Sequence, residues 1–217
     1  MNKYLVEFIG TFFLVFTVGN VVLGGEAIGV LGPLAIASSL MVMIFAGGHI
    51  SGAHYNPAVT LAVTMRGKCS PTDAVPYVVA QCVGGIAAAA AAMYLHDGGA
   101  AEMLDPVGTG SGKVLLVEFL LTFALCYVVL NTATAAGTAG NSFYGLAIGF
   151  TVLFGAVAVG GISGGAFNPA VAVGLGVMKK AAWPNIWMFL APQLVAGALA
   201  AVVFRVVNGA DDETAAS

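Results

Sequence analysis

The fold of this chain is decided by GGHISGAHYNPAVTLAV at residues 47–63, which occurs a second time as VGGISGGAFNPAVAVGL at residues 159–175. Each copy places an Asn-Pro-Ala triplet directly after a sequence rich in glycine and serine. The two asparagines, Asn56 and Asn168, are 112 positions apart. The stretch therefore indicates a duplicated unit in which a short, helix-starting motif interrupts an apolar run.

The duplication extends over most of the chain. Gln81 and Gln193 are related by the same offset of 112, and Glu7 and Glu118 by an offset of 111. The sequence therefore predicts one membrane domain made of two copies of one unit. The predicted parts are residues 1–207 for the domain, about 4–96 for repeat one, about 113–207 for repeat two, and 208–217 for a polar, disordered tail.

The composition predicts a membrane protein. Of the 217 residues, 59% are hydrophobic and 8% are charged, and the mean hydropathy is +0.98. Soluble domains have about 45–50% and 25%, so this chain has too few charges to cover a soluble surface. A helix needs roughly 20 apolar residues to span a bilayer. Six stretches qualify and lack the alternation of barrel strands: 4–23, 34–50, 72–95, 113–133, 142–161 and 184–207.

Two further apolar pieces, residues 57–65 and about 169–178, are too short to span. Each begins with proline, which suits the first helical turn, after an asparagine, which is a favoured N-cap. The Gly/Ser-rich sequences before them, 47–55 and 160–167, are expected to be non-helical. Such backbone is tolerated at membrane depth only where it is buried or lines a cavity. We predict two half-helices that enter from opposite faces and meet at their N-termini.

Each repeat contains three spans, an odd number, so the second repeat enters the membrane inverted. A functional site is then expected where the repeats meet. The predicted fold is an all-α membrane protein with six transmembrane helices and two re-entrant half-helices. We expect a multi-pass integral protein of the plasma (cell inner) membrane, with the lipid bilayer as a partner. No cofactor, metal or nucleic-acid partner is expected.

These features resemble the aquaporin (major intrinsic protein) family. The resemblance is carried by SGAHYNPAVT, SGGAFNPAVA and the glutamates of the first and fourth spans, and it covers about Tyr4 to Arg205. Two Asn-Pro-Ala triplets in register with a repeat are far more specific than one. The resemblance implies a homotetramer with a separate pore in each subunit.

The paired triplets predict the ion barrier of such a pore. Each half-helix directs the positive end of its dipole, roughly +0.5 charge, toward the other. A water molecule between the two amides accepts hydrogen bonds from both, which interrupts the chain along which protons hop, while the two positive ends repel cations. The alternative for each asparagine is a purely structural cap. The predicted pore motifs are Asn56, Pro57, Ala58, Asn168, Pro169 and Ala170.

Four polar residues are predicted to support the two loops. Glu7 and Glu118 are acids at equivalent positions inside spans, where proton relay is one hypothesis. The other is that each carboxylate accepts hydrogen bonds from a loop backbone, and the lack of titratable partners in the spans favours it. His49 and His54 flank the first loop, and no cysteine or carboxylate spacing beside them suggests a metal. We expect them to pack against the loop.

The chain departs from the family pattern at the constriction. Alignment with the family by spacing assigns it to Ile36, Ala156, Gly165 and Val171. Strict water channels carry arginine at the last position, commonly with an aromatic residue and a histidine opposite. We expect a wider, apolar constriction here, with a larger proton leak because the fixed charge is missing.

The sequence therefore predicts a passive channel for water and small uncharged solutes such as glycerol, urea, ammonia, hydrogen peroxide or metalloid hydroxides. A dewetted, slow water channel remains an alternative. Another is an ion- or proton-coupled transporter, for which only Glu7 and Glu118 are candidate coupling residues. An enzyme is not expected, because no nucleophile–base or metal motif occurs.

Overall fold

The structure is a computed structural model that describes residues 1–25, 29–98 and 107–209. Within these ranges its secondary structure is almost entirely helical. The predicted tail falls mainly on residues 210–217, which lie outside the described part. The helices are α1 (Asn2–Leu23), α2 (Gly32–Ser51), α3 (Pro57–Met65), α4 (Pro71–Leu95), α5 (Ser111–Ala133), α6 (Tyr144–Ser163), α7 (Pro169–Val177) and α8 (Trp187–Asn208), with 3₁₀ turns η2 (Gly29–Leu31), η3 (Ala136–Thr138) and η4 (Trp183–Asn185).

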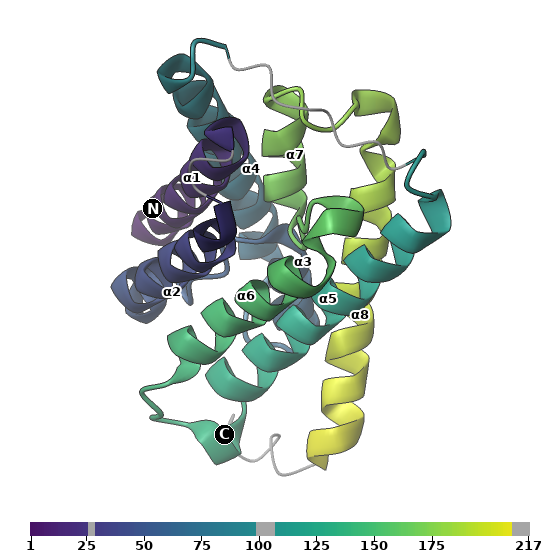
Figure 1. The fold of residues 1–217 in the computed structure, drawn as a ribbon. Coiled ribbons are helices and arrows are strands. Elements are labelled where there is room, and N and C mark those ends of the chain that lie inside the picture. The colour runs from purple at the N-terminus through teal and green to yellow at the C-terminus, as the bar shows by residue number, and fades with distance from the viewer. Residues whose placement is uncertain (26–28, 99–106, 210–217) are drawn as a thin grey trace.

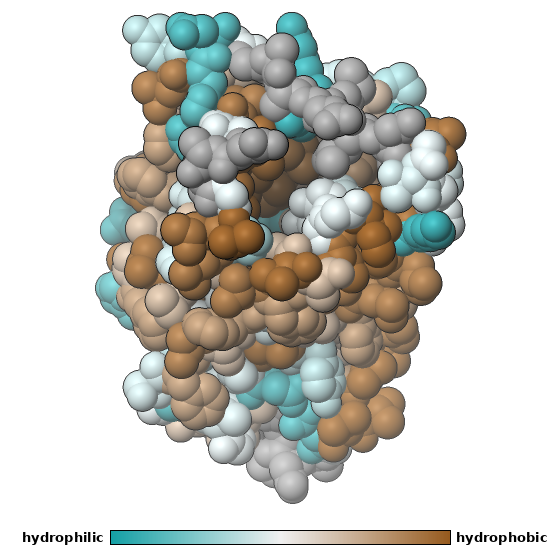
Figure 2. All heavy atoms as spheres, in the orientation of Figure 1, coloured by the Kyte–Doolittle hydropathy of each residue, from teal (hydrophilic) through white to brown (hydrophobic). Residues whose placement is uncertain are grey.

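Six of these helices are long and apolar enough to cross a membrane, namely α1, α2, α4, α5, α6 and α8. They coincide with the six predicted spans, with ends shifted by a few residues. On the face shown in Figure 2, hydrophobic side chains predominate across the middle of the molecule, and most hydrophilic side chains lie toward its two ends. The chain is therefore an integral, multi-pass membrane protein.

The expectation that the whole Gly/Ser-rich sequence leaves the helix is wrong. Helix α2 continues to Ser51 and α6 to Ser163, so the loops are only residues 52–55 and 164–167. Glycine is tolerated in α2 because close packing needs it there: a Cβ on Gly47 would lie 2.0 Å from the hydroxyl oxygen of Tyr55. Each helix ends where a glycine adopts a left-handed conformation, which is the usual helix stop.

The two half-helices occupy the centre of the bundle. Helix α1 packs on α4 and α5 packs on α8, while α2 and α6 join the two repeats. Half-helix α3 packs chiefly against α8, and α7 against α4, so each half-helix is held by the other repeat. In Figure 1, α1, α2 and α4 lie to one side and α5 and α8 to the other, with α7 between them.

Glycines allow these crossings. A Cβ on Gly85 of α4 would lie 2.9 Å from the carbonyl oxygen of Ala170, and one on Gly197 of α8 would lie 2.5 Å from that of Ala58. Small residues let helices approach closely in lipid, where hydrophobic burial does not drive them together. The backbone at the start of each half-helix is therefore in close contact with a helix of the other repeat, Ala58 with α8 and Ala170 with α4.

Candidate functional site: the meeting point of the two half-helices

Each asparagine of the triplets caps its own half-helix. Asn56 Oδ1 accepts a hydrogen bond from the backbone N–H of Ala58 at 2.8 Å. Asn168 Oδ1 accepts one from Ala170 at 2.9 Å. Both asparagines have extended backbone, which is the usual N-cap conformation, and in both helices proline follows directly. The sequence therefore fixes the start of each half-helix at its triplet.

The same side chains also join the two loops. The amide nitrogen of Asn56 donates to the carbonyl of Phe167 at 3.0 Å. The amide nitrogen of Asn168 donates to the carbonyl of Tyr55 at 2.9 Å. A side-chain amide carries two N–H groups, so these bonds use one hydrogen of each amide. The other N–H of each asparagine is available to a molecule in the cavity that both residues line.

The cross-loop bonds depend on unusual backbone conformations. Tyr55 and Phe167 have positive φ angles of 49° and 48°, a conformation that is uncommon for bulky residues and persists only where the surroundings enforce it. Their N–H groups are held by Glu7 and Glu118. Both side chains are almost completely buried. Each loop thus presents its last carbonyl to the opposite asparagine.

Glu7 is completely buried and binds the first loop with both carboxylate oxygens. Oε1 accepts hydrogen bonds from Ser51 Oγ at 2.7 Å and from the N–H of His54 at 2.9 Å. Oε2 accepts them from the N–H of Tyr55 at 2.7 Å and from Gln81 Nε2 at 2.8 Å. Within the described structure these four donors engage both oxygens of the carboxylate.

Glu118 repeats this arrangement in the second half. Oε1 accepts from Ser163 Oγ at 2.6 Å and from the N–H of Ala166 at 3.1 Å. Oε2 accepts from the N–H of Phe167 at 2.9 Å and from Gln193 Nε2 at 2.8 Å. The serines and glutamines were not among the predicted site residues. The repeat offset that relates Gln81 to Gln193 was the signal that pointed to them.

His54 and His49 occupy different environments. His54 is buried, and its Nδ1 lies 3.1 Å from the hydroxyl of Thr60. The Thr60 hydroxyl gives its hydrogen to the Asn56 carbonyl and accepts one from Gln81. It therefore accepts from His54 as well, which places the imidazole hydrogen on Nδ1. His49 instead lies exposed in the last turn of α2 and lines the wide mouth described below.

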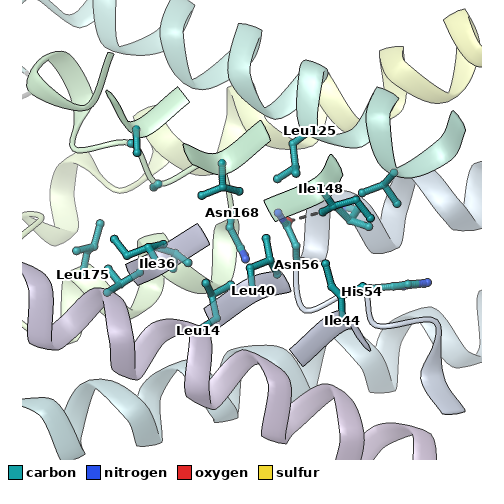
Figure 3. A pocket seen from close by; sticks show the side chains of 18 of the residues that line it. Leu14, Ile36, Leu40, Ile44, His54, Asn56, Leu125, Ile148, Asn168 and Leu175 are labelled. Atoms are coloured by element: carbon teal, nitrogen blue, oxygen red, sulfur yellow. Dashed lines mark hydrogen bonds between the residues drawn. The ribbon is translucent and has the colours of Figure 1, made fainter. Parts of the chain in front are cut away.

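A narrow cavity of about 60 Å³ passes beside both asparagines. The four predicted constriction residues all line it: Ile36, Ala156, Gly165 and Val171. Much of the remaining wall is aliphatic, including Leu14, Val18, Leu40, Leu125, Val129 and Val152. Figure 3 shows the two asparagines between Ile36 and Leu175 on one side and Ile44, Ile148 and His54 on the other.

No arginine or lysine of the described residues lines this narrow cavity. Arg205 donates from Nη2 to the carbonyl of Met65 at the far end of α3. Lys179 is exposed just beyond α7. Neither side chain therefore supplies the positive charge that an arginine at the position of Val171 would place in the cavity. The polar side chains in the wall are those of Asn56, Asn168 and His54.

A wider opening adjoins the cavity on the side of the first loop. Its volume is about 630 Å³, and His49, Lys68, Asn141 and Tyr144 are among its lining residues. Within residues 1–25, 29–98 and 107–209, no group of three or more His, Cys, Asp or Glu side chains is arranged to hold a metal. The narrow cavity and this mouth adjoin each other, because Ile44, Ala53 and Ile148 line both.

Comparison with known proteins identifies relatives over almost the whole chain. The model of the major intrinsic protein family matches residues 1–204. The chain is 36% identical to glycerol uptake facilitator protein-like 6 of Lactiplantibacillus plantarum, over 97% of this chain and 100% of that protein. It is 33% identical to aquaporin Z of Brucella melitensis, over 97% and 100%. It is also 36% identical to aquaporin NIP1-3 of Oryza sativa, over 97% and 75%.

The fold matches a solved structure as well. The X-ray structure of the aquaglyceroporin from Plasmodium falciparum superimposes with a TM-score of 0.75, covering 93% of this chain and 92% of that one. The sequence identity is 23%, so this likeness concerns the fold. Six long helices and two half-helices in an inverted repeat are thus the architecture that the sequence predicted.

Proposed function

Because the chain belongs to the major intrinsic protein family, it is a passive channel for water and small solutes, and we propose that these cross through the cavity between Asn56 and Asn168. The observation that carries the proposal is the pair of reciprocal bonds between each asparagine and the opposite loop. These bonds fix both half-helix ends at one point on the cavity, and each amide keeps one N–H for a passing molecule.

The part of the cavity beside Asn56 and Asn168, which we call the waist, is expected to exclude ions. The positive ends of α3 and α7 face the same point, so a cation there is repelled by both half-helices. A water molecule that accepts from both amides has its donors directed away from the waist, which breaks proton hopping. Glu7 and Glu118 are engaged with loop donors and serve as supports, which argues against a proton-coupled transporter.

The ring of Ile36, Ala156, Gly165 and Val171, which we call the second-loop ring, is proposed as an apolar constriction without a fixed charge. Ala156 and Gly165 leave space where larger side chains would narrow the path. Uncharged solutes broader than water are expected to enter, and protons are excluded by the waist alone. The relative named as a glycerol uptake facilitator supports a solute of this kind.

The assembly is proposed to be a homotetramer in the plasma (cell inner) membrane, without enzymatic activity. Large apolar side chains are exposed on the outside of several helices, including Phe13 of α1, Phe45 of α2 and Phe154 of α6. Such surfaces suit lipid and neighbouring subunits. The mass of the protein in detergent, measured by light scattering, distinguishes a tetramer from a monomer.

Stopped-flow light scattering on proteoliposomes tests the function. We expect rapid water flux together with glycerol or urea flux above that of empty liposomes. An imposed proton or sodium gradient should leave solute flux unchanged. Solute accumulation that follows either gradient would identify a coupled transporter instead, and rapid water flux with solutes excluded would contradict the proposed solute permeability.

A further inference from the structure

The inverted repeat gives the second-loop ring a counterpart on the other side of the asparagines. Each residue of the ring has an equivalent 112 positions away in the other repeat. We call this set the first-loop ring: Ile44, Ala53, Val59 and Ile148. All four line the same narrow cavity as the second-loop ring. The pore therefore has two rings of related composition, one on each side of the waist.

The two rings differ at one large side chain. Ile148 is the counterpart of Ile36, but Ile44 is the counterpart of Ala156. The first-loop ring thus holds two isoleucines, where the second-loop ring holds one isoleucine and one alanine. An isoleucine side chain has three more carbon atoms than that of alanine. By side-chain volume, the first-loop ring is the bulkier of the two.

Burial agrees with this difference. In the first-loop ring, Ile44 is 2% exposed and Ile148 is 5% exposed, and the other two members are buried as well. In the second-loop ring, Ile36 and Ala156 are only half-buried. The two isoleucines of the first-loop ring are therefore more enclosed by their neighbours than Ile36 and Ala156, their counterparts in the second-loop ring.

The first-loop ring also lies where the path changes width. Ile44, Ala53 and Ile148 line both the narrow cavity of about 60 Å³ and the mouth of about 630 Å³. A solute that arrives from the wide mouth meets these side chains before it reaches the asparagines. Figure 3 shows Ile44 and Ile148 together on the same side of Asn56.

The helices that carry the two isoleucines are packed too tightly to separate easily. A Cβ on Gly149 of α6 would lie 2.9 Å from the carbonyl oxygen of Ala37 of α2. A Cβ on Gly145 would lie 2.8 Å from the ring of Phe45. Gly149 follows Ile148 and Phe45 follows Ile44, so these contacts hold the backbone on which each isoleucine stands. This packing opposes separation of α2 from α6 at the level of the ring.

We propose that the first-loop ring is the size-limiting constriction of this channel and that Ile44 and Ile148 are its specificity-determining residues. The proposal rests on the function proposed above and adds where solutes are selected. An apolar ring offers no hydrogen bonds to replace hydration, so it impedes strongly hydrated or broad solutes more than it impedes water. Ions are excluded at the waist beside Asn56 and Asn168, and the first-loop ring selects by size.

The test is Ile44→Ala, which gives the first-loop ring the small residue that the second-loop ring already has. Glycerol flux in proteoliposomes is expected to rise about tenfold, equivalent to lowering a barrier by about 1.4 kcal/mol. Ile36→Ala should raise it less. Ala156→Ile, added to Ile44→Ala, should return the flux toward that of the parent. Val42→Ala, at an exposed site two residues from Ile44, is the matched control and should change nothing.

The milder variants Ile44→Val and Ile148→Val protect the test against misfolding, and each should raise the flux by a smaller factor. A larger rise with Ile36→Ala than with Ile44→Ala would overturn the proposal and assign selection to the second-loop ring. Parent flux above that of empty liposomes, unchanged in all Ile44 and Ile148 variants, would overturn this inference alone. Absence of flux from the parent and from every variant would overturn the proposed function with it.

Discussion

The first and second loops perform the same task with different amounts of polar support. In both, a buried glutamate accepts from a serine hydroxyl, two backbone N–H groups and a glutamine. Only the first half adds His54 of the loop and Thr60 of α3, whose counterparts are Ala166 and Ala172. Gln81 accordingly reaches both Glu7 and Thr60.

This difference separates what the waist requires from what one side adds. The glutamate with its serine and glutamine, the asparagine, and the left-handed residue before that asparagine occur in both halves, so they form the common support of the half-helix ends. The histidine and the threonine occur only in the first half, where His54 adds a polar side chain to the cavity wall and Thr60 lies behind it. The two halves of the pore can therefore be altered independently around a common waist.

The largest expected effect comes from Glu7→Ala and Glu118→Ala. Either change removes the acceptor of two buried backbone N–H groups, each costing about 1–3 kcal/mol when left unpaired. We expect a loss of about 4 kcal/mol, measured as a lower thermal unfolding midpoint in detergent. The two variants should be similar because their donors correspond one to one. Parent-like unfolding of either variant would show that the loops do not depend on their carboxylate.

Val171→Arg tests the missing charge of the second loop. The long cationic side chain should narrow the second-loop ring and repel protons, so glycerol flux should fall about tenfold, a barrier change of about 1.4 kcal/mol. Proton flux, followed with a pH-sensitive dye inside liposomes, should also fall. Val171→Met is the control. It lengthens the side chain without adding a charge, so proton flux should stay at the level of the parent. Equal proton flux in the parent and in Val171→Arg would contradict the charge argument.

Gly197→Ala and Gly85→Ala compare how tightly the two half-helices are packed, α3 against α8 and α7 against α4. The added Cβ meets the carbonyl oxygen of Ala58 at 2.5 Å in the first case and that of Ala170 at 2.9 Å in the second. Overpacking costs about 1–3 kcal/mol, and Gly197→Ala should be the more damaging. Thermal unfolding provides the measurement. Gly112→Ala, where nothing lies within 4 Å, should be neutral, and a reversed order of the two variants would contradict the packing argument.

Thr60→Ala gives the first half the residue type that the second half has at Ala172, and its effect should be the smallest. His54 loses its partner at 3.1 Å and Gln81 loses one of two acceptors, at a cost of about 1 kcal/mol. Thr60→Ser keeps the hydroxyl and should restore the unfolding midpoint. If the serine variant is as unstable as the alanine variant, the loss comes from the methyl group and not from the hydrogen bonds.

Much of this architecture can be predicted from the sequence because each structural motif occurs twice, once in each repeat. Hydropathy sets the six spans, and Asn-Pro sets the starts of α3 and α7. The lengths of the loops were harder to predict, since glycines in α2 and α6 look like helix breakers until their packing is seen. His49 and His54 are close in sequence, but α2 ends at Ser51, between them. His49 is therefore in the helix and His54 is in the loop.

The cavity wall could be predicted only in part. The second-loop ring was reached from spacing, and its four members line the narrow cavity. The sequence did not predict the first-loop ring, although the offset of 112 relates its residues to those of the second-loop ring. The repeat shows which positions correspond, but it does not show which of them are buried. Side-chain exposure supplied that information for Ile44 and Ile148.

The most direct test of the central claim asks whether water passes through this cavity. All three cysteines lie in the described part of the chain, and none of them lines the narrow cavity. In a variant with Cys69→Ser, Cys82→Ala and Cys126→Ala, a new cysteine can be introduced at either of two sites on the same half-helix.

The two variants are Val171→Cys, in the narrow cavity, and Val173→Cys, two residues away in an apolar groove on the other side of α7. Osmotic water flux into proteoliposomes is measured before and after mercuric chloride. The account predicts that mercury blocks flux through Val171→Cys and spares Val173→Cys. Unimpaired flux through mercury-labelled Val171→Cys, or equal block of both variants, would show that water does not take this path.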